Sequence, residues 1–170
     1  MKKTFHIMLL LFFGFSLFVS SQSVQKDLDQ VKLAQQFLGT WVGELGEDSV
    51  LHMKGVQLGD GLYFHGEWKT AGETYYAFHS VIGFTRDKET IVHSVIWSDG
   101  STVQEIGRFV AENKLVMERF RPEMPNHAVG LVEYDFSQPN KMIWRMLRRG
   151  AAVTWDPLSK FEATYTKVDD

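Results

Sequence analysis

The sequence predicts an all-β protein, a roughly ten-stranded antiparallel up-and-down β-barrel with a short N-terminal helix after a signal peptide. Three observations favour this fold. From Thr40 onward, apolar residues follow a period of two and are mainly β-branched or aromatic, as in strands that bury one face. Short segments rich in Gly, Asp, Asn and Ser separate these runs, as in hairpins. A Gly-x-Trp-x-Gly step at Gly39 to Gly43 begins the first strand, and its Trp41 is expected to plug one end of the barrel.

The first 21 residues have the parts of a secretory signal peptide. Two lysines give a charged start, an apolar run extends from Ile7 to Val19, and Ser20 to Ser23 supply the small residues of a cleavage site. The apolar run is shorter than the roughly 20 residues that a membrane helix requires. We therefore expect residues 1–21 to be removed, the mature protein to be periplasmic or secreted, and no stable membrane insertion to follow cleavage.

The next segment, residues 22–38, has apolar residues at helical spacing, among them Leu28, Val31 and Leu38. Polar residues lie between them, so this segment is predicted to be an amphipathic helix that packs against the end of the barrel. The barrel itself is predicted to occupy residues 39–170. One domain of this length can close its own core, and the sequence leaves no room for a second.

Ten strands are predicted, because ten runs have the pattern of strands. Their ranges are Thr40 to Leu45, Val50 to Val56, Leu62 to Trp68, Tyr75 to Phe84, Ile91 to Trp97, Thr102 to Val110, Leu115 to Arg121, Ala128 to Phe136, Lys141 to Arg148 and Phe161 to Val168. Short turns between successive strands indicate an antiparallel meander. The two longer irregular stretches, Pro122 to Asn126 and Gly150 to Ser159, are expected to be loops at the rim.

Several short segments resemble a known family. They are Leu38 to Glu44, Ile82 to Asp87, Ser98 to Gly100 with Gly107 to Phe109, and Ala163 to Val168. Together they are similar to exported bacterial calycin-like domains, which are lipocalin-like barrels related to nitrobindin. The resemblance implies a barrel with an interior cavity, and it implies no particular activity, because the family has none assigned. The short connection at Gly46 to Asp48 excludes the helical lid of fatty-acid-binding barrels, and the final strand differs from the closing helix of lipocalins.

Nitrobindin-like proteins hold haem through a His on the closing strands. The corresponding stretch here, Ser159 to Ala163, contains no His, and no His follows His127. We therefore expect no haem and no other cofactor, unless a His on an earlier strand or His127 takes the axial role. The His residues of the barrel also lack the close spacing of a zinc motif.

The charge of the chain excludes one class of partner. The formal net charge is −3, and no strongly basic surface is evident, so nucleic acid is not an expected partner. Cys is absent, so the fold has no disulfide to stabilise it after export. The expected partner is instead a small hydrophobic or amphipathic molecule inside the barrel.

Pairing the predicted hairpins brings polar side chains onto one face of the sheet. A turn at Arg86 to Glu89 places Ile82 opposite His93, and a turn at Ser98 to Ser101 places His93 opposite Ile106. Continuing over the following hairpin places Arg119 beside Ile106 and Arg121 beside Gln104. The candidate ligand-binding residues on this face are His93, Gln104, Arg119, Arg121, Phe78 and Trp97.

The opposite face carries Glu105 and Glu118 and is expected to meet solvent. A slip of one residue in any hairpin would exchange the two faces and bring the Glu face inside. If the first assignment holds, an apolar face with His, Gln and two Arg is typical of a pocket for a molecule with a polar or anionic head.

Three functions are compatible with this pocket. The first is an exported barrel that binds a small apolar or amphipathic ligand without catalysis. The second is a cavity enzyme, similar to an isomerase or cyclase, with His93 as acid and base and an Arg that stabilises an oxyanion. The third is a ligand-free structural module filled by its own aromatic side chains. A carboxylate near His93, for which Glu67 and Glu133 are candidates, would favour the enzyme, and an open interior would exclude the filled module.

Overall fold

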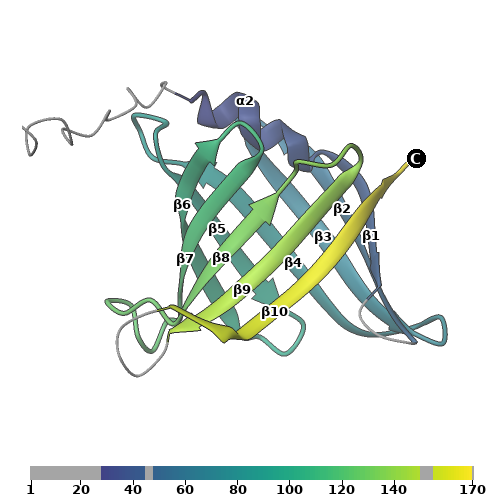
Figure 1. The fold of residues 1–170 in the computed structure, drawn as a ribbon. Coiled ribbons are helices and arrows are strands. Elements are labelled where there is room, and N and C mark those ends of the chain that lie inside the picture. Colours follow the sequence, from purple (N-terminus) through teal and green to yellow (C-terminus); the bar gives the residue numbers. More distant parts are fainter. Residues whose placement is uncertain (1–27, 45–47, 150–154, 170) are drawn as a thin grey trace, which may run out of the picture.

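The fold is a closed β-barrel of ten antiparallel strands with a short helix over one end (Figure 1). The computed structural model describes residues 28–44, 48–149 and 155–169. The strands are β1 Gly39–Glu44, β2 Ser49–Leu58, β3 Gly61–Thr70, β4 Glu73–Phe84, β5 Ile91–Trp97, β6 Thr102–Ala111, β7 Lys114–Phe120, β8 Gly130–Asp135, β9 Lys141–Arg149 and β10 Trp155–Val168. The predicted all-β class and the ten-strand meander are confirmed.

Each strand pairs with its neighbours in the sequence, and β1 pairs with β10 to close the barrel, for example at Val42 opposite Thr166. Most strand bounds lie within a few residues of the predicted ones. The exception is β10, which begins at Trp155 rather than Phe161. Its pairing with β9 shifts between Asp156 and Phe161, so a strand with an irregular segment occupies much of the predicted loop at Gly150 to Ser159.

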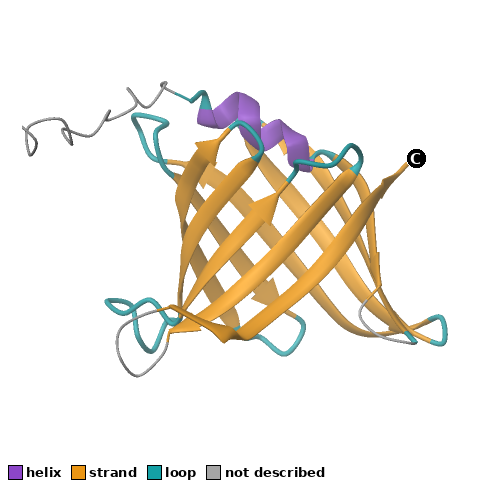
Figure 2. Ribbon diagram, in the orientation of Figure 1, coloured by secondary structure: helices purple, strands orange, loops and turns teal. Residues whose placement is uncertain are grey.

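The helical segment consists of α2, Gln30–Ala34, and the 3₁₀ turn η1, Gln35–Phe37. Asp29 caps α2, because its carboxylate accepts a hydrogen bond from the backbone N–H of Lys32 at 3.0 Å. This segment covers one end of the barrel (Figure 2). The predicted helix over residues 22–38 is therefore seen in its second half, and the part before residue 28 lies outside the described residues, as does the predicted signal peptide.

Two glutamine side chains attach the helical segment to the barrel. The Gln30 amide oxygen accepts from the Phe109 backbone N–H at 2.7 Å, and its nitrogen donates to the Phe109 carbonyl at 3.3 Å. The pairing of β5 with β6 ends at Gly107, so Phe109 lies beyond its last partner on β5. The Gln30 amide thus satisfies backbone groups that the sheet leaves free. Gln36 donates to the Glu112 carbonyl at 2.8 Å in the β6–β7 turn.

Aromatic rings fill the end of the barrel below the helix. Phe37 makes edge-to-face contacts with Phe64, Tyr134 and Phe136, with ring centroids 5.9, 5.0 and 4.9 Å away. Trp41 is 2% exposed, and its indole N–H donates to the Phe37 carbonyl at 3.0 Å. The helix-covered end is therefore closed by packed rings, and the remaining interior space lies further along the barrel. Within the described parts of the chain, no helix has the length and apolar character needed to cross a membrane.

Candidate functional site

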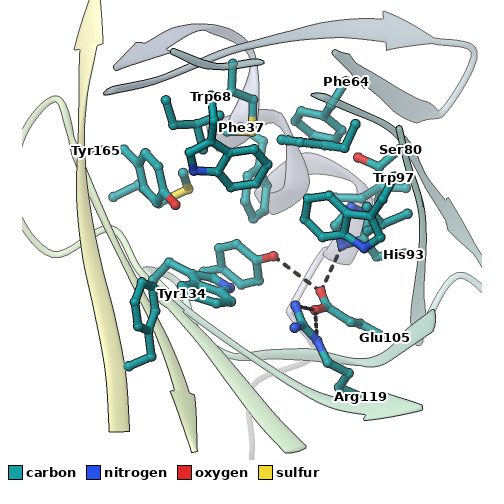
Figure 3. Close-up of a pocket in the computed structure, with 18 residues that line it drawn as sticks. Phe37, Phe64, Trp68, Ser80, His93, Trp97, Glu105, Arg119, Tyr134 and Tyr165 are labelled. Carbon is teal, nitrogen blue, oxygen red and sulfur yellow. Dashed lines mark hydrogen bonds and ion pairs between the residues drawn. The ribbon is translucent and has the colours of Figure 1, made fainter. Parts of the chain in front are cut away.

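The barrel contains a cavity of about 200 Å³ (Figure 3). Its wall is mostly aromatic and aliphatic, with side chains from all strands except β1 and with Phe37 from η1. Trp68, Phe78 and Trp97 form one cluster, with pairwise ring-centroid distances of 5.3 to 5.5 Å. Trp68 and Trp97 lie near the ends of β3 and β5 at the rim away from the helix. The interior is thus an apolar cavity with a cluster of aromatic rings toward the end away from the helix.

A charged group lies within this apolar wall. Glu105 on β6 is completely buried, and its carboxylate accepts hydrogen bonds from three side chains (Figure 3). His93 Nδ1 lies 2.9 Å from Oε2, and the Tyr134 hydroxyl donates to the same oxygen at 3.3 Å. Arg119 donates to Oε1 through Nε at 2.8 Å and also through Nη2. Both oxygens of this carboxylate therefore have hydrogen-bond partners among the described side chains.

The charges of this cluster balance one another. Burial acts to raise the pKa of Glu105, but Arg119 and His93 outweigh it, so the pKa falls from 4.5 to about 2. Burial likewise acts to lower the pKa of Arg119, and the charge of Glu105 reverses this effect, so the pKa is raised. Burial and Glu105 raise the pKa of Tyr134 well above its ordinary value. At neutral pH the carboxylate and the guanidinium are ionised and Tyr134 is a neutral hydrogen-bond donor.

Arg119 is also held by apolar neighbours. Its guanidinium carbon lies 5.6 Å from the centre of the Trp144 ring, and Nη1 donates to the Met146 sulfur at 3.2 Å. The side chain is only 16% exposed. Its charge is therefore already compensated within the protein, which makes it a poor partner for an anionic ligand.

Two buried polar atoms of the cavity wall have no hydrogen-bond partner among the described residues. They are His93 Nε2 and Ser80 Oγ, and the two residues are 9% and 3% exposed. Buried polar atoms are normally paired, so such exceptions need an explanation. Ser80 lies opposite Val95 and His93 lies opposite Ile82, which makes Ser80 and His93 diagonal neighbours on one inward face. The cavity wall thus contains two residues that each carry an unpaired buried polar atom.

The structure places four of the six predicted site residues at this cavity: His93, Arg119, Phe78 and Trp97. The predicted pairing of Ile82 with His93 is confirmed. Gln104 was predicted to face inward, and this is wrong, because it is exposed and lies opposite Ser94 and Phe120. Arg121 is also outside, with a side chain that is 60% exposed and 3.9 Å from Glu123.

The error at Gln104 comes from the β5–β6 turn. The loop was predicted to have four residues, Ser98 to Ser101, but it has three, Ser98 to Gly100. The Trp97 N–H donates to the Ser101 carbonyl, and the Gly100 N–H donates to the Trp97 carbonyl. Gly100 has a φ of 82°, the left-handed conformation that closes such a loop. His93 therefore pairs with Glu105 instead of Ile106, and β6 turns its other face inward.

A second shift restores the predicted face of β7. An extra residue in β6 between Phe109 and Ala111 forms a bulge, so Arg119 pairs with Glu105 rather than Ile106. Because the two shifts cancel, Arg119 faces inward as predicted, although its neighbour is different. Glu105, predicted to face solvent, is the central residue of the cluster, and sequence reasoning also gave no role to Tyr134.

The prediction that Glu67 or Glu133 supplies a carboxylate near His93 was also wrong. The Glu67 carboxylate contacts His65 and Lys69, and Glu133 pairs with Lys114, so both carboxylates are engaged elsewhere. Of the described histidines, only His93 lines the cavity. No group of three His, Cys, Asp or Glu side chains in the described ranges is arranged to hold a metal ion. The expectation that haem does not bind stays a prediction.

The fold and the cavity define this protein as a ten-stranded barrel with an apolar interior and one buried polar cluster. No protein-family model matches the sequence, and no curated protein is significantly similar to it. The function must therefore be inferred from the chemistry of the cavity.

Proposed function

We propose that this protein binds a small, largely apolar molecule with one uncharged polar group inside the barrel, without catalysis. The observation that carries the proposal is the pair of unsatisfied polar atoms, Ser80 Oγ and His93 Nε2, in an otherwise aromatic and aliphatic cavity. Burial of apolar ligand surface would supply most of the affinity, at about 25 cal/mol per Å². The polar atoms would fix the orientation of the ligand.

Two features of the cavity limit the size and the charge of the expected ligand. The cavity volume of about 200 Å³ is below the roughly 300 to 1,000 Å³ of pockets for drug-sized compounds, which favours a small molecule. The sequence suggested an anionic head that meets Arg119 and Arg121. The pairing of Arg119 with Glu105 and the exterior position of Arg121 favour an uncharged head instead. The proposal includes export, with the ligand met in the periplasm or outside the cell.

Filling the cavity tests this proposal. Val95 is buried in the wall, so Val95→Phe should weaken the binding of naphthol or methylnaphthalene at least about tenfold, through steric overlap with the ligand. Val81 on the neighbouring strand is 42% exposed and absent from the cavity wall, so Val81→Phe is the matched control and should bind like the wild type. Isothermal titration calorimetry measures both. Absence of any heat of binding for both compounds with the wild-type protein would contradict the proposal and favour a ligand-free module.

A second candidate function is proton transfer within the cavity. It is favoured by the 2.9 Å contact between His93 and Glu105, because a carboxylate that holds one ring nitrogen orients the other and stabilises the imidazolium formed when it accepts a proton. This pair supplies the carboxylate that the enzyme interpretation requires. His93 Nε2 would remove a proton from carbon beside a carbonyl group of the ligand and return it to another carbon, which is an isomerisation.

Hydrogen–deuterium exchange tests this candidate. Tetralone, a bicyclic ketone, carries such a proton, and its exchange in D₂O can be followed by NMR. If the protein is a catalyst, the wild type should accelerate the exchange. His93→Gln should lower the catalysed rate at least about 100-fold, as for loss of a general base. Exchange at the buffer rate with the wild-type protein, under conditions where tetralone binds, would exclude this activity for ketones of this kind.

A further inference from the structure

The hydrogen bonds of Glu105 determine which ring nitrogen of His93 carries a proton. Arg119 has only donors, and the Glu105 carboxylate is ionised and has only acceptors. The His93 Nδ1 atom lies 2.9 Å from Oε2, so it must carry the hydrogen of that bond. In the uncharged imidazole the other nitrogen, Nε2, then has a lone pair and no hydrogen. Nε2 is therefore an unpaired hydrogen-bond acceptor on a side chain that lines the cavity.

The second unsatisfied atom has the complementary capacity. The Ser80 hydroxyl has one hydrogen and can donate it, and it lies diagonally from His93 on the same inward face. A hydroxyl group matches both capacities, because it can donate one hydrogen bond and accept another. A ketone or an ether would leave Nε2 unpaired, and a carboxylate would bring a negative charge and a lone pair toward it.

The remaining wall favours a flat ring system as the body of the ligand. Trp68, Phe78 and Trp97 form an aromatic cluster in the cavity wall, and the rings of Phe64 and Tyr134 line the same cavity. Aromatic rings gain from offset or edge-to-face contacts in addition to the burial of their area. Phe64 itself stands edge-to-face to the His93 ring, with centroids 6.1 Å apart, so the polar position borders an aromatic surface.

We infer that the cavity selects an aromatic alcohol, whose hydroxyl group donates a hydrogen bond to His93 Nε2 and accepts one from Ser80, with Glu105 as the residue that fixes the His93 tautomer. This inference rests on the proposed function and specifies its ligand class. Glu105 is a positioning residue in this arrangement, because it acts on the ligand only through His93.

The test compares naphthol, methylnaphthalene and naphthoate that carry their substituents at the same ring position. Calorimetric titrations of the three compounds are made at one and the same pH. The wild-type protein should bind naphthol about tenfold more tightly than methylnaphthalene, because the methyl group leaves buried polar atoms unpaired. Naphthoate should bind more weakly than naphthol. Equal binding of naphthol and methylnaphthalene would overturn the inference and the polar group of the proposed ligand, and would leave only the binding of an apolar molecule inside the barrel. No binding of either compound would contradict both the inference and the proposed function.

Two variants test whether His93 causes the preference for naphthol over methylnaphthalene. His93→Phe keeps a ring in the wall and removes the acceptor, so methylnaphthalene should still bind and the preference for naphthol should disappear. His79→Phe is the matched control, because His79 is exposed on the outer face of β4 and should leave the preference unchanged. A preference that survives in folded His93→Phe would overturn the inference.

A measurement on the wild-type protein keeps the inference testable if His93→Phe does not fold. Nitrogen NMR of the histidine rings distinguishes the two tautomers directly. The His93 ring should have its proton on Nδ1 in the free protein, and addition of naphthol should shift the Nε2 resonance more than that of Nδ1. A proton on Nε2 of the uncharged ring, or an Nε2 resonance that naphthol leaves unchanged at saturation, would contradict the inference.

Discussion

Arg119→Met is expected to lower the free energy of unfolding by about 3 to 5 kcal/mol, the usual cost of removing one partner of a buried ion pair. The reason is the position of Glu105, which has no exposed surface and takes its only full positive charge from Arg119 among the described contacts. Without the guanidinium, the carboxylate must either stay charged in an apolar wall or take up a proton. Urea denaturation at neutral pH measures the loss.

Two controls separate charge balance from loss of packing. Glu105→Gln combined with Arg119→Met removes both charges and should recover much of the stability, because a buried pair replaced by uncharged residues is often neutral in its effect. Arg121→Met changes a nearby Arg that is 60% exposed, and it should alter stability by less than about 0.5 kcal/mol. Equal destabilisation by Arg119→Met and by the double variant would show that the charge of Glu105 is not the cause.

Acid provides an independent check of the same pair. The pKa of Glu105 is lowered from 4.5 to about 2, so its ionised form stabilises the folded state at pH values above the unfolded value. This contribution should decline as the pH falls below about 4.5 and be lost below about 2. Arg119→Met removes the main interaction that lowers the pKa of Glu105. The decrease in the free energy of unfolding that Glu105 causes in acid should therefore be smaller in this variant. Urea midpoints measured over this pH range for both proteins test the expectation.

The strands were predictable because their signals are local. Alternation of apolar and polar residues, with turn residues between the runs, is enough to define ten strands and to pair neighbours as hairpins. The β4–β5 register was also predictable, because its loop at Arg86 to Glu89 has the length that the sequence suggests. The early start of β10 was not, because the segment after Trp155 contains Pro157 and its pairing is irregular.

The central residue of the candidate site was not predictable for two physical reasons. The face of β6 depends on whether Gly100 closes a loop of three or four residues, and a difference of one residue exchanges its two faces. A Glu on a strand is also expected to be exposed to solvent unless a buried partner is known, and the partner Arg119 lies on another strand. The bulge near Val110 compensated the first error, so the inward position of Arg119 was correct although its assigned neighbour was not.

Trp41→Ala is expected to lower the free energy of unfolding by about 3 to 5 kcal/mol, as for other removals of large aromatic side chains from a core. Trp41 is buried at the helix-covered end, near Phe136 at a ring distance of 6.3 Å, and its N–H holds the Phe37 carbonyl. Its loss would leave a cavity at the point where η1 meets β1 and would release the bond that holds Phe37. Thermal and urea denaturation measure the effect.

Trp41→Phe is the matched control for this prediction. It keeps an aromatic ring in the core and removes the indole N–H, so it should cost about 1 to 3 kcal/mol, the range for a buried acceptor that loses its donor. Because Phe37 belongs to the cavity wall, Trp41→Ala should also weaken naphthol binding, whereas Trp41→Phe should affect it less. A Trp41→Ala protein that unfolds at the wild-type temperature would mean that the barrel end does not depend on this ring, and the role of Trp41 as an end plug would have to be abandoned.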